Sequence, residues 1–156
     1  MRQFDLTTQW QLESAIDRVW DAIVTVEKWP HWWRFVHAVE ELEKGDAEGL
    51  GALRTYTWSS KLPYRLTFAM RVTAVRRPTY LEGMAVGDLT GNGRWRLAAE
   101  GSTTRVRYDW QVLTSRAWMN ALAPILAPMF RWNHGEVMAE GARGLARYLG
   151  VQQLGT

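Results

Sequence analysis

The sequence contains no cysteine, which excludes disulfide bonds, thiolate metal sites and a cysteine nucleophile. It also lacks the run of about 20 apolar residues that a membrane span requires. Its first residues, Met1–Asp5, lack the apolar stretch of a signal peptide. We therefore expect a cytoplasmic protein without an integral membrane segment, and transient contact with a membrane surface stays open.

A long tract of one charge is also missing. The 19 lysines and arginines are offset by 16 aspartates and glutamates, so the formal net charge is only +3. The arginines stand singly or in pairs, as in Arg76-Arg77, and such residues on the outward side of strands usually form a solvated face. We expect no nucleic-acid partner.

Motifs for metal, phosphate or hydrolytic chemistry are absent from the sequence. The three histidines, His31, His37 and His134, do not have a metal-ligand spacing, and no G-x-S-x-G motif supplies a serine nucleophile. Two glycine-rich stretches, 45–51 and 91–93, do not stand between a strand and a helix as a phosphate-binding loop does. We interpret both as hairpin turns and expect neither a metal nor a cofactor.

What the chain has in abundance is tryptophan, with ten in 156 residues. This length predicts a single domain, residues 1–156, and the composition of 47% hydrophobic and 22% charged residues is that of a globular protein. Each buried indole removes about 150–250 Å² from water, so ten of them overfill an ordinary small core. The excess indicates that the protein surrounds something aromatic or apolar.

The spacing of apolar residues changes along the chain. Residues 4–12 alternate, which predicts a strand, and residues 16–23 repeat every 3.6 positions, which predicts a helix. Pro30 then begins a second short helix. From there to about residue 115 the pattern alternates again and predicts about six strands with one apolar face. The facing of the strand at 79–88 stays open, because two sets of residues compete for the inside: Leu81, Gly83 and Ala85, or Met84 and Val86.

The last part of the chain has a helical pattern. Residues 131–149 predict one continuous helix, and Pro124 and Pro128 break or kink the pattern before it because proline removes a backbone donor. Small residues on this helix, including Gly141 and Gly144, permit close approach to a sheet or a ligand. The order of one strand, two short helices, a run of strands and a long helix predicts an α+β fold.

Several segments together resemble a known family. They are Val19–Ile23, Trp29–Trp33, the turn at Gly45–Gly51, the strand around Trp110 and the final long helix. In kind and order they are similar to the polyketide cyclase/dehydrase and lipid-transport family of the START/Bet v 1-like (SRPBCC) superfamily. The resemblance covers nearly the whole chain.

The resemblance implies a helix-grip fold, in which a curved seven-stranded antiparallel sheet grips the C-terminal helix and a cavity lies between them. Members of the family bind lipids, sterols, polyketides and other hydrophobic molecules. A minority catalyse cyclisation or dehydration in that cavity. The superfamily has no shared catalytic motif, so the resemblance assigns no catalytic residue here.

The tryptophans are expected to have different roles. Trp10 and Trp20 are expected in the core beneath the first helix. Trp32 and Trp33 are about 100° apart around a helix, so we expect one in the core and the other at an entrance. In the alternative, both pack under the first helix and the sheet edge. Trp29, together with Trp32, is expected to rim an opening.

Arg54, Tyr56 and Trp58 share one face of a strand, because they are two positions apart. If that face is concave, Arg54 offers a cation to a carboxylate or enolate of a ligand, within aromatic walls. If the face is convex, Arg54 is solvated.

Asn133 and His134 stand near the start of the long helix. His134 shares a helical face with Val137 and Met138, so a neutral imidazole can face the cavity as a general base or a hydrogen-bond donor. In the alternative, His134 is structural and ties the backbone near Pro128.

These residues define a predicted site and three functions. The ligand-binding residues are Trp33, Arg54, Tyr56, Trp58, Phe68, Met70, Trp95, Tyr108, Trp110, Phe130, Asn133, His134, Val137 and Met138. The protein binds a hydrophobic small molecule such as a lipid, polyketide, sterol or quinone-like compound. Alternatively, it is an aromatase/cyclase in which acid–base catalysis falls to His134, Arg54, Tyr56 or Tyr108. In a third reading it is a protein-interaction module with a filled core.

Overall fold

The structure is a computed structural model that describes residues 2–61, 65–86, 89–114 and 117–155. At positions 2, 3, 89, 113, 114, 117–127, 129, 130 and 155 only the backbone is described. The predicted ligand contact of Phe130 therefore lies outside the described side chains.

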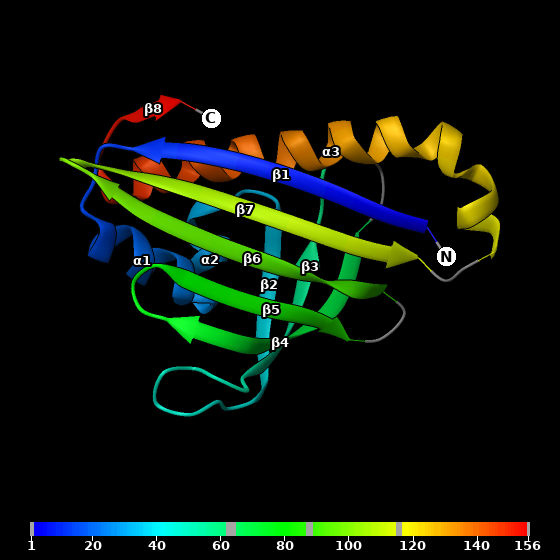
Figure 1. The fold of residues 1–156 in the computed structure, drawn as a ribbon, viewed down its shortest axis with the longest axis horizontal. Coiled ribbons are helices and arrows are strands. Elements are labelled where there is room, and N and C mark those ends of the chain that lie inside the picture. Colours follow the sequence, from blue (N-terminus) through cyan, green and yellow to red (C-terminus); the bar gives the residue numbers. More distant parts are fainter. Residues whose placement is uncertain (1, 62–64, 87–88, 115–116, 156) are drawn as a thin grey trace.

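The chain folds in the order that the sequence predicts (Figure 1). The elements are β1 (Arg2–Leu12), α1 (Ile16–Val24), the 3-10 helix η1 (Val26–Lys28), α2 (Trp29–Trp32), β2 (Val36–Glu43), β3 (Leu53–Trp58), β4 (Leu66–Arg76), β5 (Tyr80–Val86), β6 (Leu89–Glu100), β7 (Thr103–Thr114), α3 (Ala117–Leu149) and β8 (Gln153–Gly155). The helix-grip fold is confirmed. Within the described residues, no helix combines the length and hydropathy of a membrane span.

The strands form one antiparallel sheet in the order β2-β3-β4-β5-β6-β7-β1-β8. Seven long strands carry the sheet, as expected, and the eighth is a three-residue strand beside β1. In Figure 1 the sheet curves so strongly that β2 and β3 cross behind β5 and β6 at a steep angle. The curvature leaves a concave side on which the helices pack.

Helix α3 lies along β1 and begins earlier than the sequence predicts, at Ala117 instead of about residue 131. Pro128 lies inside α3 and does not end it, so the helix bends without breaking; Figure 1 shows its yellow first turns bending away from the orange and red part. Gly141 and Gly144 let α3 approach α2 closely, as expected. A methyl group at Gly144 would collide with the carbonyl oxygen of Trp32.

The strand pairings define an inner face of the sheet, turned toward α3, and an outer face. Leu81 pairs with Trp95, and Trp95 pairs with Tyr108, which contacts His134 of α3; these side chains therefore share the inner face. On β5 this settles the open question in favour of Leu81, Gly83 and Ala85. Met84, at 51% exposure, and Val86, at 49%, point outward.

The interpretation of Gly91–Gly93 as a hairpin turn is wrong. These residues lie within β6, where Gly91 pairs with Val112 and Gly93 with Trp110. The ring of Tyr108 crosses the position that a side chain at Gly93 would take, and a side chain at Gly91 would collide with the backbone of Gln111. The other glycine-rich stretch does turn the chain between β2 and β3, where Asp46 Oδ1 accepts hydrogen bonds from two backbone N–H groups of the loop.

The expectations for Trp29, Trp32 and Trp33 need correction. Trp29 and Trp32 do not rim an opening, since both are buried. Trp32 and Trp33 also share one core, with ring centroids 5.4 Å apart and planes 15° from parallel. The 100° rule fails because Trp33 follows the end of α2 in an extended conformation. Trp10 and Trp20 are core residues, as expected.

Candidate functional site

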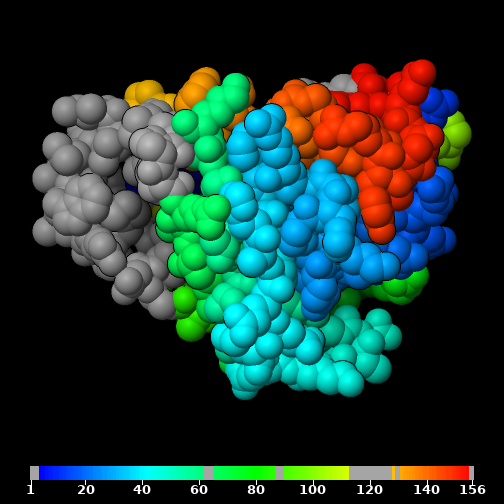
Figure 2. Space-filling view, turned by 180° about the vertical axis from the view of Figure 1, so that it is seen from behind, coloured from blue at the N-terminus to red at the C-terminus, as the bar shows by residue number. Residues whose placement is uncertain are grey.

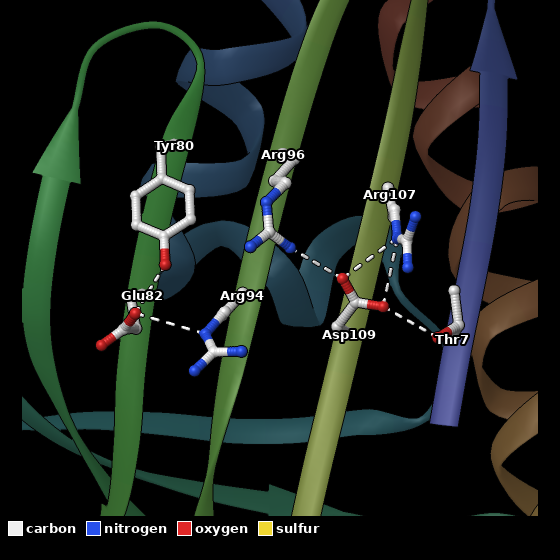
Figure 3. A network of polar contacts seen from close by, with 7 residues as sticks. All are labelled: Thr7, Tyr80, Glu82, Arg94, Arg96, Arg107 and Asp109. Carbon is white, nitrogen blue, oxygen red and sulfur yellow. Dashed lines mark hydrogen bonds and ion pairs between the residues drawn. The ribbon is translucent and has the colours of Figure 1, made fainter. Parts of the chain in front are cut away.

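The outer face of the sheet is covered by paired charges. Figure 3 shows Asp109 between two arginines: its carboxylate lies 2.8 Å from Arg96 and 3.1 Å from Arg107, and it accepts a hydrogen bond from Thr7. Beside them Tyr80 and Arg94 both contact Glu82, and the hydrogen bond from Tyr80 lowers the pKa of that carboxyl. The arginine-rich strands therefore form the solvated face that their charge pattern predicts.

The inner face carries almost no charge. Among the described side chains that the pairings place on it, only Arg54 and Glu41, its cross-strand partner at the edge strand β2, are charged at neutral pH. The guanidinium Nε of Arg54 lies 2.8 Å from Glu27 Oε1, and Glu41 stands 3.9 Å away. The structure thus places Arg54 on the concave face, but a ligand carboxylate would have to displace Glu27 to reach it.

Indole rings fill one end of the interior, the end that α1 and α2 cover. We call Trp10, Trp29, Trp32, Trp33 and Trp95 the indole cluster; all five are buried. Centroid distances between neighbouring rings run from 5.0 Å for Trp29–Trp33 to 6.3 Å for Trp33–Trp95, within the range of aromatic contacts. Trp33 Nε1 also donates to the Val137 carbonyl at 2.9 Å, which ties the cluster to α3.

Toward the other end, a second set of rings has a different character. Phe68, Trp110, Tyr108 and His134, which we call the ring row, are all only half-buried. Consecutive centroids are 5.9, 6.3 and 6.5 Å apart, and consecutive planes are 30°, 15° and 15° from parallel. Met70 lies on the same face, where its methyl group covers Gly83. Each ring of the row therefore keeps part of its surface accessible.

The titratable rings of this region are uncharged at neutral pH. Burial lowers the pKa of His134 to about 4 and raises the pKa of Tyr108 above its usual range. Burial also raises the pKa of Tyr56 to about 12, against a smaller opposing effect of the Arg54 cation. Tyr108 and His134 are therefore a neutral phenol and a neutral imidazole in contact, each able to donate and accept a hydrogen bond.

Among the described residues, buried polar atoms without a hydrogen-bond partner occur in both regions: Trp58 Nε1 and Asn133 Oδ1 here, and Trp10 Nε1 and Trp32 Nε1 in the indole cluster. Trp58 packs against Trp33 at 5.1 Å, and Trp33 bonds to Val137, one helical turn after Asn133. We call the region between the end of β3, at Trp58, and α3 the seam. A buried donor or acceptor without a partner costs about 1–3 kcal/mol.

An ion pair closes this seam on the surface. Lys61 Nζ, beyond the end of β3, lies 2.8 Å from Glu136 Oε2 on α3. Figure 2 shows the green segment that leads to Lys61 reaching the orange part of α3. Sequence reasoning missed this pair, because nothing in the local pattern brings residues so far apart in the chain together.

The remaining predicted site residues fall into two groups. Trp33 and Trp95 belong to the indole cluster, and Val137 and Met138 are buried against it. Tyr56 is buried beside Trp29, with centroids 5.8 Å apart, and stacks on Phe68 at 6.3 Å. The structure therefore brings the predicted residues to one face, but it divides them between a filled end and the ring row.

Sequence reasoning also missed Glu27 as the partner of Arg54 and Gly93 as the residue beneath the ring of Tyr108. Gly93 alternates in phase with the inward-facing residues of β6, and this phase could have indicated that another side chain covers the backbone there. In the described part of the chain, no group of three or more metal-ligating side chains comes together.

The fold is shared with several solved structures. Over 94% of this chain and 93% of the other, it is similar to the Zhui aromatase/cyclase from Streptomyces sp. R1128, with a TM-score of 0.77 at 14% identity. A START superfamily protein from Mycobacterium smegmatis gives 0.76 at 13% identity over 94% and 97% of the two chains. Ginseng major latex-like protein 151 from Panax ginseng gives 0.69 at 10% identity over 94% and 97%.

The family is shown by sequence. Residues 3–150 match the family described as polyketide cyclase/dehydrase and lipid transport, and the chain belongs to that family. No curated protein is similar enough in sequence to give a match. Together the family and the neighbouring folds support a role in binding a hydrophobic ligand or in cyclisation.

Proposed function

We propose that this protein binds a hydrophobic small molecule with a planar ring system between the inner face of the sheet and α3. One observation carries the proposal: the rings of Phe68, Trp110, Tyr108 and His134 are half-buried, uncharged and near-parallel. Flat apolar walls with a few polar groups are typical of small-molecule sites. The proposed ligand-contacting residues are the ring row, with Tyr56, Trp58, Met70 and Asn133 around it.

The depth of the ring row supports the same conclusion. Tyr108 packs against Trp95 with ring centroids 4.3 Å apart and covers Gly93, so its ring lies deep among protein atoms, yet Tyr108 and His134 both keep accessible surface. A side chain combines depth with accessible surface where it borders an internal space or its mouth. The family and its folds favour such a space at this place.

The proposal is tested with N-phenyl-1-naphthylamine, an uncharged probe that fluoresces when it leaves water. We expect saturable binding and about a fivefold loss of affinity in Phe68→Ala, since one aromatic contact is worth about 0.5–1.5 kcal/mol. Met84→Ala, which removes an exposed apolar side chain from the outer face, is the matched control. Equal affinity in both variants, or no saturable binding by the natural sequence, would contradict the proposal.

One observation favours cyclase activity as a second function. Tyr108 and His134, two of the predicted catalytic candidates, are in ring contact at 6.5 Å, so a neutral acid and a neutral base converge on one space. The test is the product distribution from a linear polyketone. A cyclised product formed by the natural sequence and lost in both Tyr108→Phe and His134→Gln would support this function. Identical products with and without the protein would exclude it for that substrate.

A further inference from the structure

We infer that Met70 determines how wide a ring system the site accepts. The end of its side chain covers bare backbone at Gly83, and by moving aside it makes room for a wider ligand. This inference rests on the proposed function and names a residue that sets its specificity.

The inner face of β5 and β6 carries a patch of four positions without a side chain larger than a methyl group. Gly83 pairs with Gly93, and Ala85 pairs with Gly91, so the four positions adjoin on neighbouring strands. Glycine weakens the interior of a strand, because it has no side chain to pack and loses more conformational freedom on folding than any other residue. Each glycine of this bare patch therefore needs a physical reason.

Two of these glycines have rigid neighbours. A side chain at Gly93 would collide with the ring of Tyr108, and a side chain at Gly91 would collide with the backbone of Gln111. Neither neighbour can move without disturbing the sheet or the ring row. At these two positions, the packing of the protein itself requires glycine.

Gly83 has no rigid neighbour of this kind, and it keeps accessible surface. A β-carbon there would meet the terminal methyl group of Met70 at 3.2 Å and the carbonyl oxygen of Arg71 at 3.5 Å, an ordinary contact distance. Methionine is unbranched and has three rotatable bonds, so its methyl group can move. The packing does not require glycine at this position, and the bare backbone leaves Met70 room to shift.

Met70 also stands beside the ring row. It lies two positions from Phe68 on the inner face of β4, and its side chain is only half-buried. In the sheet β5 and β6 separate β4 from β7, yet the rings of Phe68 and Trp110 come within 5.9 Å of each other. The two rings therefore meet over the strands that carry the bare patch. A planar ligand on these rings meets Met70 at its edge, so the position of that side chain limits the width of the ligand.

Two uncharged probes test the inference. They are anthracene and pyrene, planar hydrocarbons of similar length, of which pyrene is the wider. The fluorescence of each probe follows its binding. The readout is the ratio of the two dissociation constants, because a general loss of folding or of apolar contact changes both constants alike.

Removal of the Met70 side chain should widen the site. We expect Met70→Ala to shift the ratio about tenfold in favour of pyrene, the effect of a small apolar group in a fitted site. Gly83→Ala should shift the ratio about fivefold the other way, since the added methyl group pushes the end of Met70 toward the ligand. In the double variant the effect of Gly83→Ala should largely disappear, because the group that transmits it is gone.

Met70→Ile tests the mobility of the side chain at nearly constant volume. Isoleucine is branched at Cβ and therefore stiff, so it cannot move aside as methionine does. We expect weaker binding of pyrene and unchanged binding of anthracene. Met84→Ala, next to Gly83 in sequence but on the outer face, is the matched control and should leave both constants unchanged.

The outcomes separate this inference from the proposed function. An unchanged ratio in Met70→Ile, or in a folded Met70→Ala protein, would overturn the role of Met70. An equal effect of Gly83→Ala with and without the Met70 side chain would do the same. If N-phenyl-1-naphthylamine still binds and Phe68→Ala still weakens it, the proposed function stands in either case. Absence of saturable binding by all three probes would overturn both.

Discussion

The two ends of the interior use the same residue types for different purposes. In the indole cluster the rings are buried and contact one another, and Trp33 and Trp29 find carbonyl acceptors for their N–H groups. In the ring row the rings are half-buried and keep accessible surface. A closed aromatic core stabilises the fold, whereas an incompletely covered one leaves surface for another molecule.

If this comparison holds, substitutions in the indole cluster should cause the largest losses of stability. Trp33→Ala should lower the free energy of unfolding by about 3–5 kcal/mol, because it leaves a large cavity and removes the donor to Val137. Urea denaturation measures the change. Trp132→Ala, at a side chain that is 50% exposed, should change stability by less than about 0.5 kcal/mol. Similar losses of unfolding free energy in the two variants would contradict the comparison.

A second prediction concerns the close packing of α3 on α2. Gly144→Ala should cost about 2–3 kcal/mol, since the added methyl group meets the rigid carbonyl of Trp32. Gly135→Ala on the same helix meets nothing and should raise helix stability by about 0.5–1 kcal/mol. Thermal unfolding of both proteins gives the comparison, and a stabilised Gly144→Ala protein would show that the filled end is looser than described.

The ring row should impose a pH dependence on stability. His134 has a folded pKa of about 4 against an ordinary value of 6.5, so between these values the unfolded chain binds a proton that the folded protein does not. The free energy of unfolding therefore falls as the pH drops from about 6.5 toward 4, by at most about 3 kcal/mol. Urea denaturation across this range should show the fall. The free energy of unfolding of His134→Gln should fall less over the same range, because it lacks the contribution of His134. If the free energy of unfolding had the same slope against pH in both proteins, His134 would be in contact with bulk water and not buried.

Truncation of Phe68 in the ring row should cost less stability than truncation in the indole cluster. Phe68→Ala removes a side chain that is already half-exposed, so it should cost only about 1 kcal/mol while it weakens probe binding. Denaturation and the fluorescence titration are done on the same variant. A loss as large as that of Trp33→Ala would mean that Phe68 is a core residue.

Much of the architecture could be predicted from local patterns. The alternation of β7 around Tyr108 and Trp110 and the helical spacing around Trp20 depend only on neighbouring residues, and both were predicted correctly. The error at Gly91–Gly93 arose because a hairpin turn and a bare strand under a tyrosine ring have the same local sequence. The error at Trp32 and Trp33 arose because the end of α2 falls between them.

The site was less predictable, because its character depends on distant partners. Arg54 faces inward, as one alternative held, yet its charge is taken up by Glu27 from a different element. The strand pattern also does not distinguish Trp95, which is buried, from Trp110, which keeps accessible surface. That distinction depends on how the helices cover the two ends of the sheet.

The central claim is that the indole cluster fills one end of the interior while the ring row stays accessible to a ligand. The most direct test is an NMR spectrum of the ten indole N–H groups during titration with N-phenyl-1-naphthylamine. After assignment by single substitution to phenylalanine, the resonances of Trp58 and Trp110 should move in proportion to the bound fraction. The resonance of Trp20, a buried residue of α1, should stay in place. Movement of Trp20 with Trp110 unchanged, or no movement of any indole resonance at saturation, would contradict the account.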